Sequence, residues 1–319
     1  MSIANDLSVE LPVLGVPVRF YANDLSVREA VTASFGQWRV LDRWPHLLAM
    51  RGVNVRLKVI GDTEGGRTDV TYDVTPARVE FRIGRSHGVA HMARREAYAH
   101  VTRELVSDSA LFGYGVLEAL TLTLVTTLDR QPVHGALLRR DELGIVLAGP
   151  SGMGKSSVGY LAQMRGFEML SDDATYVQLD GAQRVWGSPG RSYVPKDVAS
   201  RIAELRDREP RLLPSGKRKI VAALKGVSGE RPPVVDRVGV CLLQRDGGKA
   251  WIRRVQPAAV ATFLLEGLGP QRALYAATAA PAVEWLAGDG GWLINLSSDP
   301  GDGVRLLESV VSDLQGRGV

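Results

Sequence analysis

Residues 143–157 read LGIVLAGPSGMGKSS, and this stretch decides what kind of fold the chain can form. The first six residues are apolar or small and predict a buried strand. The next eight satisfy the pattern G-x-x-x-x-G-K-[ST], and the residues that follow are compatible with a helix. The order of strand, glycine-rich loop and helix therefore predicts a phosphate-binding loop, or P-loop.

Each fixed position of this loop has a physical role. The glycines let the backbone curl, so that several N–H groups point at phosphate oxygens. Lys155 would place a positive charge on the β- and γ-phosphates, and the Ser156 hydroxyl would ligate a Mg²⁺ ion that bridges them. The helix that follows would point its positive N-terminal end at the anion. The predicted nucleotide-binding residues of this segment are Gly149, Pro150, Ser151, Gly152, Met153, Gly154, Lys155, Ser156 and Ser157.

The bulk composition is that of an ordinary globular protein. The chain has 319 residues, enough for one large domain or two modest ones, and its formal net charge is only +4. A charge this small, without a basic stripe interleaved with aromatic residues, argues against nucleic-acid binding. The single cysteine, Cys241, excludes an intramolecular disulfide, and no signal peptide or long apolar run is apparent. We therefore expect a cytoplasmic protein that does not bind a membrane.

Patterning divides the chain into two parts. Residues 1–100 predict a strand-rich α+β unit, with strands at 54–60 and 69–74 joined as a hairpin through Gly65. Residues 101–319 predict an α/β domain that holds the P-loop. Within it we expect one strand over 167–179, a long loop with one helix over 181–219, and a hairpin formed by 235–243 and 250–255.

Three more features could contribute to a phosphate site. Asp172 and Asp173 follow a hydrophobic segment 17 residues after the P-loop lysine, and such carboxylates could hold Mg²⁺ or activate an acceptor hydroxyl. The alternative is an acidic turn between two short strands. His134 precedes the P-loop strand and could tune one of these carboxylates, although a lone histidine is more often structural.

The third feature is the basic segment Gly216, Lys217, Arg218 and Lys219. Beside a triphosphate, Lys217 and Arg218 could close over the phosphates and stabilise transferring charge. Three adjacent cations are also typical of a solvated loop, and spacing does not decide between these interpretations.

Together these residues resemble the kinase domain of HPr kinase/phosphorylase and its relatives. The resemblance rests on His134-Gly135, the P-loop, Arg165-Gly166-Phe167 and Leu170-Ser171-Asp172-Asp173, and it is specific over residues 130–180. It implies a mixed α/β fold related to phosphoenolpyruvate carboxykinase, and phosphorylation of a serine with ATP (or GTP) and Mg²⁺. It also implies oligomers, as in that family.

The resemblance carries roles over to matching residues. Lys155 would contact phosphate, Ser156 and Asp172 would lie on the metal side, Asp173 would be the acceptor base, and His134 would support it. The second family signature, E-[IV]-R-G-x-G, has no clear match after the Asp pair. The chain therefore looks more like the related kinases that phosphorylate a peptide serine than like a true HPr kinase.

Two other functions remain open at this stage. One is phosphorylation of a small hydroxylated molecule by the same site. The other is a nucleotide-binding regulatory protein with little or no kinase activity. The presence of Lys155, Ser156, Asp172 and Asp173 together favours a kinase.

Overall fold

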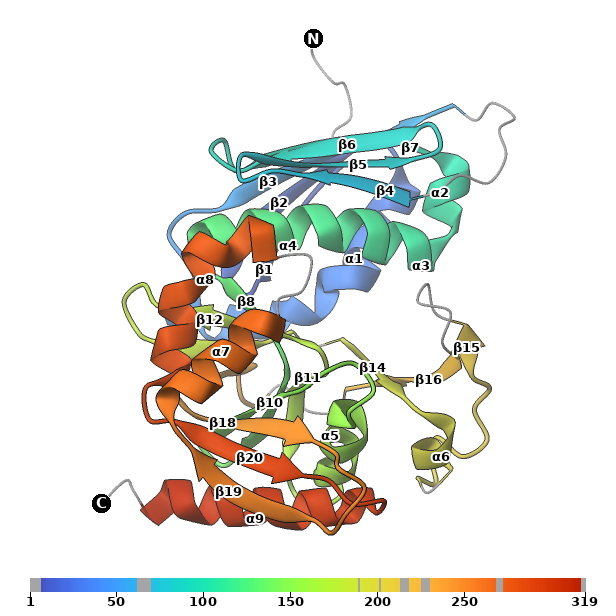
Figure 1. Ribbon diagram of the computed structural model, residues 1–319. Coiled ribbons are helices and arrows are strands. Elements are labelled where there is room, and N and C mark those ends of the chain that lie inside the picture. Colours follow the sequence, from blue (N-terminus) through green and yellow to red (C-terminus); the bar gives the residue numbers. More distant parts are fainter. Residues whose placement is uncertain are drawn as a thin grey trace. The chain divides into compact units, whose positions relative to one another are not determined.

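The chain folds into two compact units, residues 1–130 and 131–319. The computed structural model describes residues 7–61, 70–188, 190–200, 202–212, 218–224, 230–267 and 272–316 (Figure 1). Strands pair both parallel and antiparallel, so the predicted mixed α/β class is confirmed. The boundary lies 30 residues later than the predicted one at residue 100, because the helices that follow β7 pack in the first unit.

The first unit is built on a seven-stranded sheet in the order β1-β2-β3-β7-β6-β5-β4. Its strands are β1 (Leu7–Val13), β2 (Val16–Ala22), β3 (Val53–Ile60), β4 (Val70–Val74), β5 (Arg78–Ile83), β6 (Ser86–His91) and β7 (Glu96–Thr102). The strands predicted at 54–60 and 69–74 exist, but the predicted hairpin between them is wrong. β3 pairs with β2 and β7, parallel to both, and β4 forms the far edge beside β5. Gly65 lies outside the described residues.

Helices cover the first sheet. They are α1 (Leu25–Phe35), the 3₁₀ segments Gly36–Arg43 and Pro45–Leu47, α2 (Arg103–Ser107), α3 (Ser109–Phe112), a π-helical turn (Gly113–Glu118), α4 (Ala119–Val125) and the 3₁₀ turn Thr126–Leu128. In the described part of the chain, the run Ser109–Leu128 is the one helical stretch long and apolar enough to cross a membrane. Of its most apolar window, 67% is buried inside the structure. This stretch therefore packs mostly within the protein.

The second unit is built on a six-stranded sheet in the order β11-β9-β10-β18-β20-β19, with a four-stranded sheet β17-β13-β12-β8 and a small sheet β14-β16-β15 beside it. The strands are β8 (Gln131–His134), β9 (Ala136–Arg140), β10 (Leu143–Ala148), β11 (Glu168–Ser171), β12 (Ala174–Gln178), β13 (Arg184–Gly187), β14 (Arg191–Val194), β15 (Arg211–Leu212), β16 (Arg218–Ala223), β17 (Val234–Val235), β18 (Arg237–Gln244), β19 (Trp251–Val255) and β20 (Gly291–Asn295). The helices are α5 (Lys155–Gln163), α6 (Lys196–Ala199), α7 (Pro257–Gly267), α8 (Arg272–Ala287) and α9 (Pro300–Gly316).

Both faces of the six-stranded sheet are buried. On one face, α5 and α9 pack through Val158, Ala162, Leu307 and Val310 against apolar residues of β10, β18 and β20 (Figure 1). On the other, α7, α8 and the four-stranded sheet pack against the alternate residues of the same strands. This double coverage explains why β10 reads as an unbroken apolar run, as strands of covered parallel sheets do. Cys241 of β18 is fully buried, and burial raises the pKa of its thiol.

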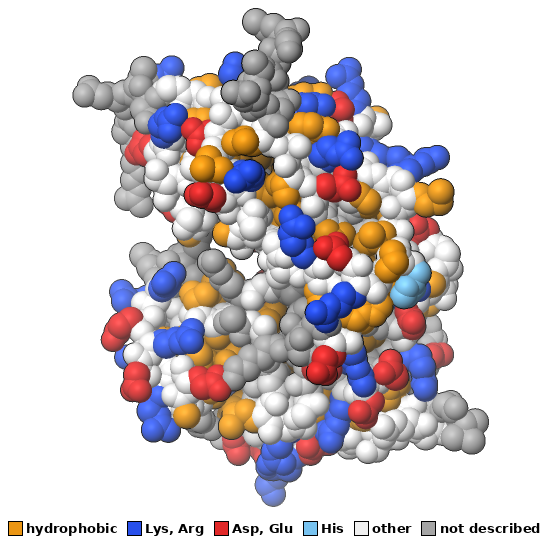
Figure 2. Space-filling model, turned by 180° about the vertical axis from the view of Figure 1, so that it is seen from behind, with side chains coloured by type: hydrophobic (Ala, Val, Ile, Leu, Met, Phe, Trp, Pro, Cys, Tyr) orange, Lys and Arg blue, Asp and Glu red, His pale blue; other side chains and the backbone are white. Residues whose placement is uncertain are grey.

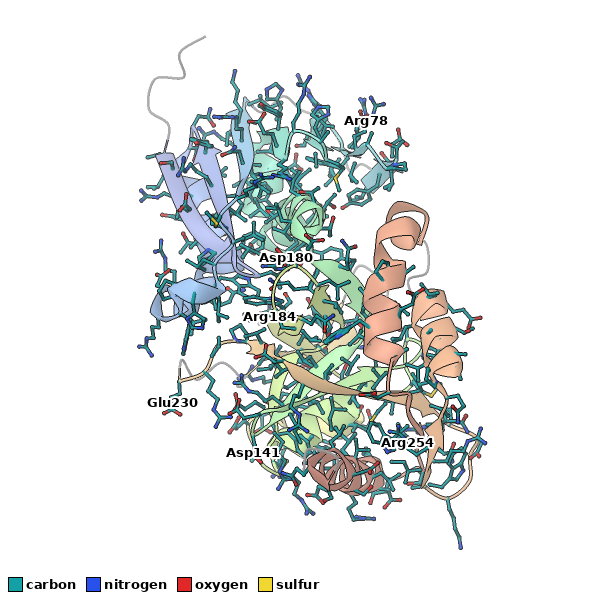
Figure 3. The ribbon with its side chains drawn as sticks, turned by 90° about the vertical axis from the view of Figure 1, so that its left-hand side faces the viewer. Arg78, Asp141, Asp180, Arg184, Glu230 and Arg254 are labelled. Atoms are coloured by element: carbon teal, nitrogen blue, oxygen red, sulfur yellow. The ribbon has the colours of Figure 1, made fainter. Side chains whose placement is uncertain are left out.

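Asp141 marks one end of the strands in this sheet, and Arg254 marks its outer strand β19. Asp141, with a left-handed φ of 55°, forms the tight turn between β9 and β10, at the opposite end of β10 from the P-loop (Figure 3). Arg254 of the outer strand β19 lies over the Trp292 ring, 4.2 Å from its centroid. The predicted hairpin of 235–243 with 250–255 is wrong, because β20 inserts between β18 and β19 and pairs with both.

The segment 181–219 is more regular than expected. The prediction is a long loop with one helix over 196–205, whereas the described residues of this segment form the short strands β13, β14, β15 and β16 and the single turn α6. β14 and β16 pair in a small separate sheet whose apolar side packs against Tyr160 of α5. Strands this short, in a segment rich in Pro, Gly and Arg, carry too little periodicity to be read from sequence.

Two neighbouring segments of the second unit change sheets at the same place. β8 passes into β9 at Gly135, and β11 passes into β12 at Asp172 and Asp173. The predicted single strand over 167–179 is therefore broken at the Asp pair. We call these two positions the corners. Because Leu147 of β10 pairs with Ala136, both corners lie at the end of β10 that leads into the P-loop.

Hydrogen bonds hold the two corners together. The Gly135 N–H donates to the Asp173 carbonyl at 3.0 Å, and the Thr175 hydroxyl donates to the Gly135 carbonyl at 2.8 Å. The Ser171 hydroxyl contacts the Thr175 hydroxyl at 2.9 Å and accepts from the Leu137 N–H at 3.0 Å. These bonds replace the strand-to-strand hydrogen bonds where the strands part. They provide partners for the Gly135 amide and carbonyl, the Asp173 carbonyl and the Leu137 amide.

We expect Gly135→Ala to destabilise the second unit. A Cβ at this position would lie 2.9 Å from the Leu147 carbonyl oxygen and 3.0 Å from Val146, so backbone would have to move. The expected loss is about 1–3 kcal/mol in the free energy of unfolding, measured by urea denaturation. Gly316→Ala, where a Cβ meets nothing within 4 Å, is the matched control and should change stability by less than about 0.5 kcal/mol. Equal stability of the two variants would contradict the close approach at the corner.

Candidate active site

The glycine-rich loop joins β10 to α5, as predicted from sequence. Gly152 and Gly154 have φ values of +90° and +113°, in the region that residues with a side chain rarely adopt. Gly154 is the residue immediately before α5, so the loop turns sharply into the helix N-terminus. The loop thus has the strand–loop–helix context that a P-loop requires.

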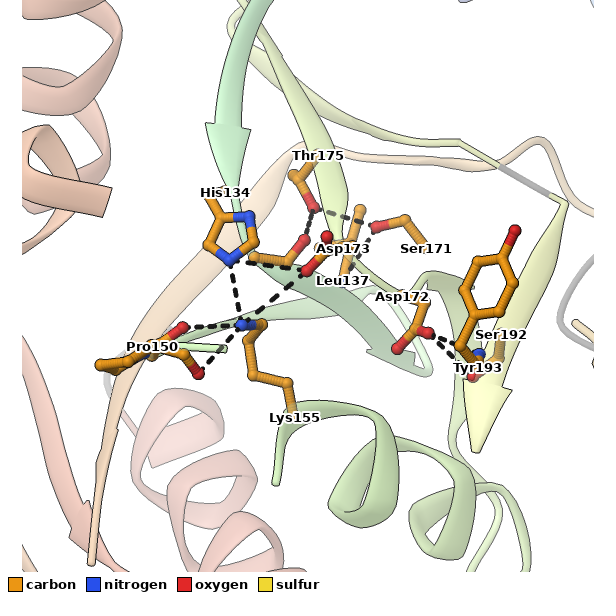
Figure 4. Close-up of polar contacts among 12 residues, drawn as sticks. His134, Leu137, Pro150, Lys155, Ser171, Asp172, Asp173, Thr175, Ser192 and Tyr193 are labelled. Atoms are coloured by element: carbon orange, nitrogen blue, oxygen red, sulfur yellow. Dashed lines mark hydrogen bonds and ion pairs between the residues drawn. The ribbon is translucent and has the colours of Figure 1, made fainter. Parts of the chain in front are cut away.

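Lys155 is the charged residue of the loop, and it is buried, with a relative exposure of 6%. Its Nζ donates to the Gly149 carbonyl at 2.6 Å and contacts the His134 Nε2 at 3.0 Å (Figure 4). The Asp173 Oδ1 lies 3.8 Å away. Burial lowers the pKa of Lys155, and the charges of Asp173 and Asp172 oppose this effect. The ammonium group is thereby held at the mouth of the loop, close to a carboxylate.

His134 ends β8 at the first corner and points at the lysine. Its Nε2 lies 3.0 Å from Lys155 Nζ and 3.5 Å from Asp173 Oδ1. A charged ammonium only donates, so the ring nitrogen that faces it must be the unprotonated acceptor. Burial lowers the pKa of His134, Asp173 raises it and Lys155 lowers it. The neutral ring is thus the form that suits this geometry.

The two aspartates of the second corner point in different directions. Asp172 is buried, with a relative exposure of 7%, whereas the Asp173 side chain is 68% exposed. The Asp172 Oδ2 accepts from the Ser192 hydroxyl at 3.0 Å and from the Tyr193 N–H at 2.9 Å (Figure 4). One carboxylate is therefore fixed within the protein and the other faces solvent beside Lys155.

The second oxygen of Asp172 has unused bonding capacity. The Oδ1 atom is buried and has no hydrogen-bond partner. Burial raises the pKa of Asp172, and the Ser156 hydroxyl is among the groups that lower it, which puts that hydroxyl beside the carboxylate. A cation could bind both the Asp172 Oδ1 and the Ser156 hydroxyl oxygen, since Mg²⁺ takes carboxylate and hydroxyl oxygens as ligands. Ser156 and Asp172 thus fit the metal that the sequence implies.

Ser156 and Asp172 would supply two protein ligands to a metal ion. Among the residues that the structure describes, no group of three or more His, Cys, Asp or Glu side chains is placed to hold a metal ion. A Mg²⁺ ion bound with a nucleotide needs only one or two carboxylates from the protein, because phosphates and water supply the other ligands.

The basic segment brings Lys219 near the P-loop. Lys217 lies outside the described residues. Arg218 of β16 donates to the Pro210 carbonyl at 3.3 Å, within its own small sheet. The next residue, Lys219, lies near enough to lower the pKa of Lys155. Adjacent strand residues face opposite ways, so Lys219 is the cation of this strand on the P-loop side. The role of Arg218 stays a prediction.

Sequence reasoning missed Arg245. This residue directly follows β18, the strand parallel to β10, and its Nη2 would lie 3.7 Å from a Cβ placed on Gly154. The guanidinium group is therefore beside the P-loop. The available signal was its position at the carboxyl end of a parallel strand, where such sheets gather their ligand-binding residues. That signal could be used only once β18 was known to lie next to β10.

The surface around the two units is mixed in charge. On the face shown in Figure 2, the Lys and Arg side chains of the described residues are interspersed with Asp and Glu.

The contacts around His134 have a measurable consequence. We expect its pKa to lie below 6.5, to rise when Lys155 is replaced by Met, and to fall further in Asp173→Asn, because the two neighbours act in opposite directions. An NMR titration of the imidazole C–H resonances measures all three values. His134→Gln identifies the resonance among the five histidines of the chain. A pKa that is unchanged in both charge variants would contradict the contacts described above.

Comparison with known proteins adds a relationship in sequence. No family model matches the chain. It is 25% identical over 154 residues to an HPr kinase/phosphorylase of Streptococcus agalactiae, a match that covers 47% of this chain and 44% of the relative. An HPr kinase/phosphorylase of Streptococcus pyogenes is 34% identical over 61 residues, 19% of this chain and 20% of the relative.

A solved structure gives a weaker correspondence. The Hpr(Ser) kinase/phosphatase of Coxiella burnetii aligns with 59% of this chain and 92% of its own, at 13% sequence identity and a TM-score of 0.34. In the sequence matches the chain spans less than half of the length of the curated relatives. The chain is therefore related in sequence to the HPr kinase/phosphorylases.

Proposed function

We propose that the chain is a kinase that uses ATP and Mg²⁺ to phosphorylate a hydroxyl group, with a serine of a peptide or protein as the favoured acceptor. The observation that carries this proposal is the exposed carboxylate of Asp173, whose Oδ1 lies 3.8 Å from the P-loop ammonium of Lys155. A kinase needs both kinds of group in one site: a cation for the transferring phosphate and a carboxylate for the acceptor proton.

The donor side would be formed by the loop and Lys155. The backbone N–H groups of residues 149–156 and the N-terminus of α5 would bind the phosphates. The ammonium group of Lys155 is already engaged by the Gly149 carbonyl and the His134 Nε2. A phosphate oxygen would compete for these same ammonium hydrogens, and the stronger charge-assisted bond would favour the phosphate.

The metal side would be formed by Ser156 and Asp172. The bonds from Ser192 and Tyr193 hold one carboxylate oxygen of Asp172, which leaves Oδ1 for a cation. Mg²⁺ bound there would neutralise charge on the phosphate oxygens during transfer. The charge of the ion would also offset the burial that disfavours the ionised form of Asp172.

The acceptor side would be formed by Asp173 and His134. The exposed Asp173 carboxylate would orient the acceptor hydroxyl and take its proton as the new oxygen–phosphorus bond forms and the bond to the leaving nucleoside diphosphate breaks. His134 would support that carboxylate through Lys155, because its Nε2 accepts from the ammonium group that also faces Asp173 Oδ1. Burial favours the neutral form of His134. In that form His134 would give no proton to Asp173, so the carboxylate would stay free to take the proton of the acceptor hydroxyl.

The sequence bears on which hydroxylated acceptor the chain would phosphorylate. The curated relatives are named for HPr and for both a kinase and a phosphorylase reaction. The signature E-[IV]-R-G-x-G that accompanies the phosphorylase reaction and HPr recognition has no clear match in this chain. We therefore propose a kinase of the phosphoenolpyruvate carboxykinase-like fold that acts on a hydroxylated acceptor other than HPr, with the first unit as the candidate for acceptor recognition.

A nucleotide-binding regulatory protein is the second candidate. Such a protein would need the P-loop but neither an exposed carboxylate beside Lys155 nor a buried carboxylate with a free oxygen beside Ser156. The presence of both favours catalysis. Incubation of the protein with γ-labelled ATP and serine peptides, proteins or small hydroxylated compounds separates the two, since only the kinase transfers the label.

We expect Asp173→Asn to retain ATP binding and to lower the rate of phosphoryl transfer by about 10²–10⁴-fold, because the amide cannot accept the hydroxyl proton. Lys155→Ala should weaken ATP binding as well as transfer. Calorimetry with MgATP and label transfer measure the two effects separately. If Asp173→Asn transferred phosphate at the wild-type rate, another group would have to be the base.

We expect Asp172→Asn to raise the Mg²⁺ concentration that gives half-maximal transfer by about tenfold or more, which corresponds to at least about 1.4 kcal/mol of metal-binding free energy. The physical reason is the loss of the charge that faces Ser156. Asp173→Asn is the matched control from the same corner and should leave the Mg²⁺ requirement unchanged. The same Mg²⁺ requirement in both variants would remove Asp172 from the metal site.

A further inference from the structure

The sheet of the first unit has one apolar face and one polar face. α4 packs against β3, β6 and β7 on the apolar face, where Val55, Leu57 and Ala99 are buried (Figure 1). Successive strand residues point to opposite faces, so the alternate side chains of these strands form the polar face. Burial follows this alternation along β3, β6 and β7. The polar face is therefore where these strands present their charged side chains.

Four basic side chains form a row across the polar face. Lys58 of β3 lies opposite His100 of β7, and His100 lies opposite His87 of β6. Arg82 of β5 continues the row, opposite His87. The two imidazole rings meet edge to face, with their centroids 5.2 Å apart. Burial, followed by the charges of His87 and Lys58, lowers the pKa of His100. We call these four residues the cationic row.

The carboxylates of the polar face do not neutralise the cationic row. Three of them are already engaged, in the pairs Glu10–Arg19 at 2.7 Å, Glu80–Arg78 at 2.9 Å and Glu96–Tyr98 at 2.6 Å. Within the described part of the chain, no carboxylate lies within ion-pair distance of a member of the row. Like charges directly opposite one another on neighbouring strands destabilise a sheet. A bound anion would offset this repulsion.

His87 is oriented to offer one ring nitrogen to a ligand. Its Nδ1 lies 3.1 Å from the Arg85 carbonyl oxygen. A carbonyl oxygen only accepts, so Nδ1 carries the proton of the neutral ring. Nε2 is then the nitrogen that gains a proton beside an anion, and it would become a hydrogen-bond donor.

A hollow opens over one end of the cationic row. Its volume is about 530 Å³, and its lining includes three of the four residues of the row together with the exposed Tyr98. Asp73 and Glu80 also line it, on the neighbouring cross-strand row. These two carboxylates would repel a long polyanion such as a nucleic-acid backbone. The cationic row is left to a short acidic segment.

The spacing of the row suits an extended peptide that crosses the strands. The strand order β3-β7-β6-β5 puts three inter-strand spacings of about 4.8 Å between Lys58 and Arg82, or about 14 Å in all. Every second side chain of an extended peptide points the same way, and residues i and i+4 are about 13 Å apart. Acidic residues at i and i+4 would therefore reach Lys58 and Arg82, and one at i+2 would lie over the imidazoles.

We propose that the cationic row binds an extended segment of the peptide or protein acceptor that carries carboxylates at alternate positions. The binding follows from the sheet, and its assignment to the acceptor rests on the proposed function. Lys58 and Arg82 supply permanent charges. The two imidazoles gain protons more readily once carboxylates lie beside them.

The binding test uses fluorescein-labelled peptides and anisotropy, without nucleotide. The probe is Ala-Asp-Ala-Asp-Ala-Asp-Ala, and the control peptides carry Asn in place of Asp, or three adjacent Asp residues. We expect the double variant Lys58→Gln, Arg82→Gln to bind the probe at least tenfold more weakly than the wild type. Arg19→Gln, on the same face but already paired with Glu10, is the matched control and should bind like the wild type.

Several results would overturn the docking surface. They are no binding of the probe by the wild type, equal binding of the Asp and Asn peptides, or unchanged binding by the double variant. Equal binding of the peptide with adjacent Asp residues would overturn the extended geometry. Tighter binding of heptauridylate than of the probe, lost in the double variant, would make the face a nucleic-acid site instead.

Probes extended by a serine separate docking from the proposed function. If the wild type transfers labelled phosphate to them, the double variant should raise KM at least tenfold and leave kcat unchanged. Transfer with an unchanged KM contradicts the assignment to the acceptor, while the kinase stands. Binding without transfer to these or other hydroxylated compounds contradicts the kinase, while the docking surface stands.

A second measurement uses the wild-type protein and does not depend on the folding of the double variant. Addition of the probe should shift the imidazole C–H resonances of His87 and His100 in an NMR titration. The resonance of His46, in a 3₁₀ turn of the same unit, should stay in place. His87→Gln and His100→Gln assign the two signals. Shifts confined to His46 or His134 would overturn the proposal.

Discussion

The candidate site depends on the hydrogen bonds that join the two corners of the second unit. Gly135 donates to the Asp173 carbonyl and accepts from Thr175, and this pair of bonds fixes the main chain on either side of the aspartates. Each of the two segments leaves one sheet and enters another at this point. A residue at such a corner has neighbours from both sheets, which is why one side chain of the Asp pair is buried and the next is exposed.

The electrostatics of the site follow from that geometry. Lys155 is buried and would lose its charge more readily than an exposed lysine, but two carboxylates oppose this loss. His134 is kept neutral by burial and by the neighbouring ammonium group. Asp172 is disfavoured as an anion by burial and has one oxygen without a partner. The three groups together form a site whose charges are balanced better when an anion and a cation are bound, as a magnesium nucleotide would supply.

The sequence predicted the P-loop because an apolar strand, a glycine-rich pattern and a helix-compatible segment follow one another directly. It also predicted that His134 and the Asp pair lie near Lys155, through the family resemblance. It did not decide that the strand breaks at the Asp pair: an acidic turn between two short strands was the alternative interpretation, and no local pattern shows where a segment leaves one sheet for another. Nor could it predict that β20 inserts between β18 and β19, since the pairing of distant strands leaves no local pattern. Arg245 was missed for the same reason.

The most direct test of the account is a crystal structure with Mn²⁺ in place of Mg²⁺ and the β,γ-imido analogue of ATP. The account predicts an anomalous peak for Mn²⁺ between Ser156 and the Oδ1 of Asp172, with the terminal phosphate against Lys155 and facing Asp173. A metal peak away from Asp172, or a terminal phosphate directed away from the corners, would contradict it.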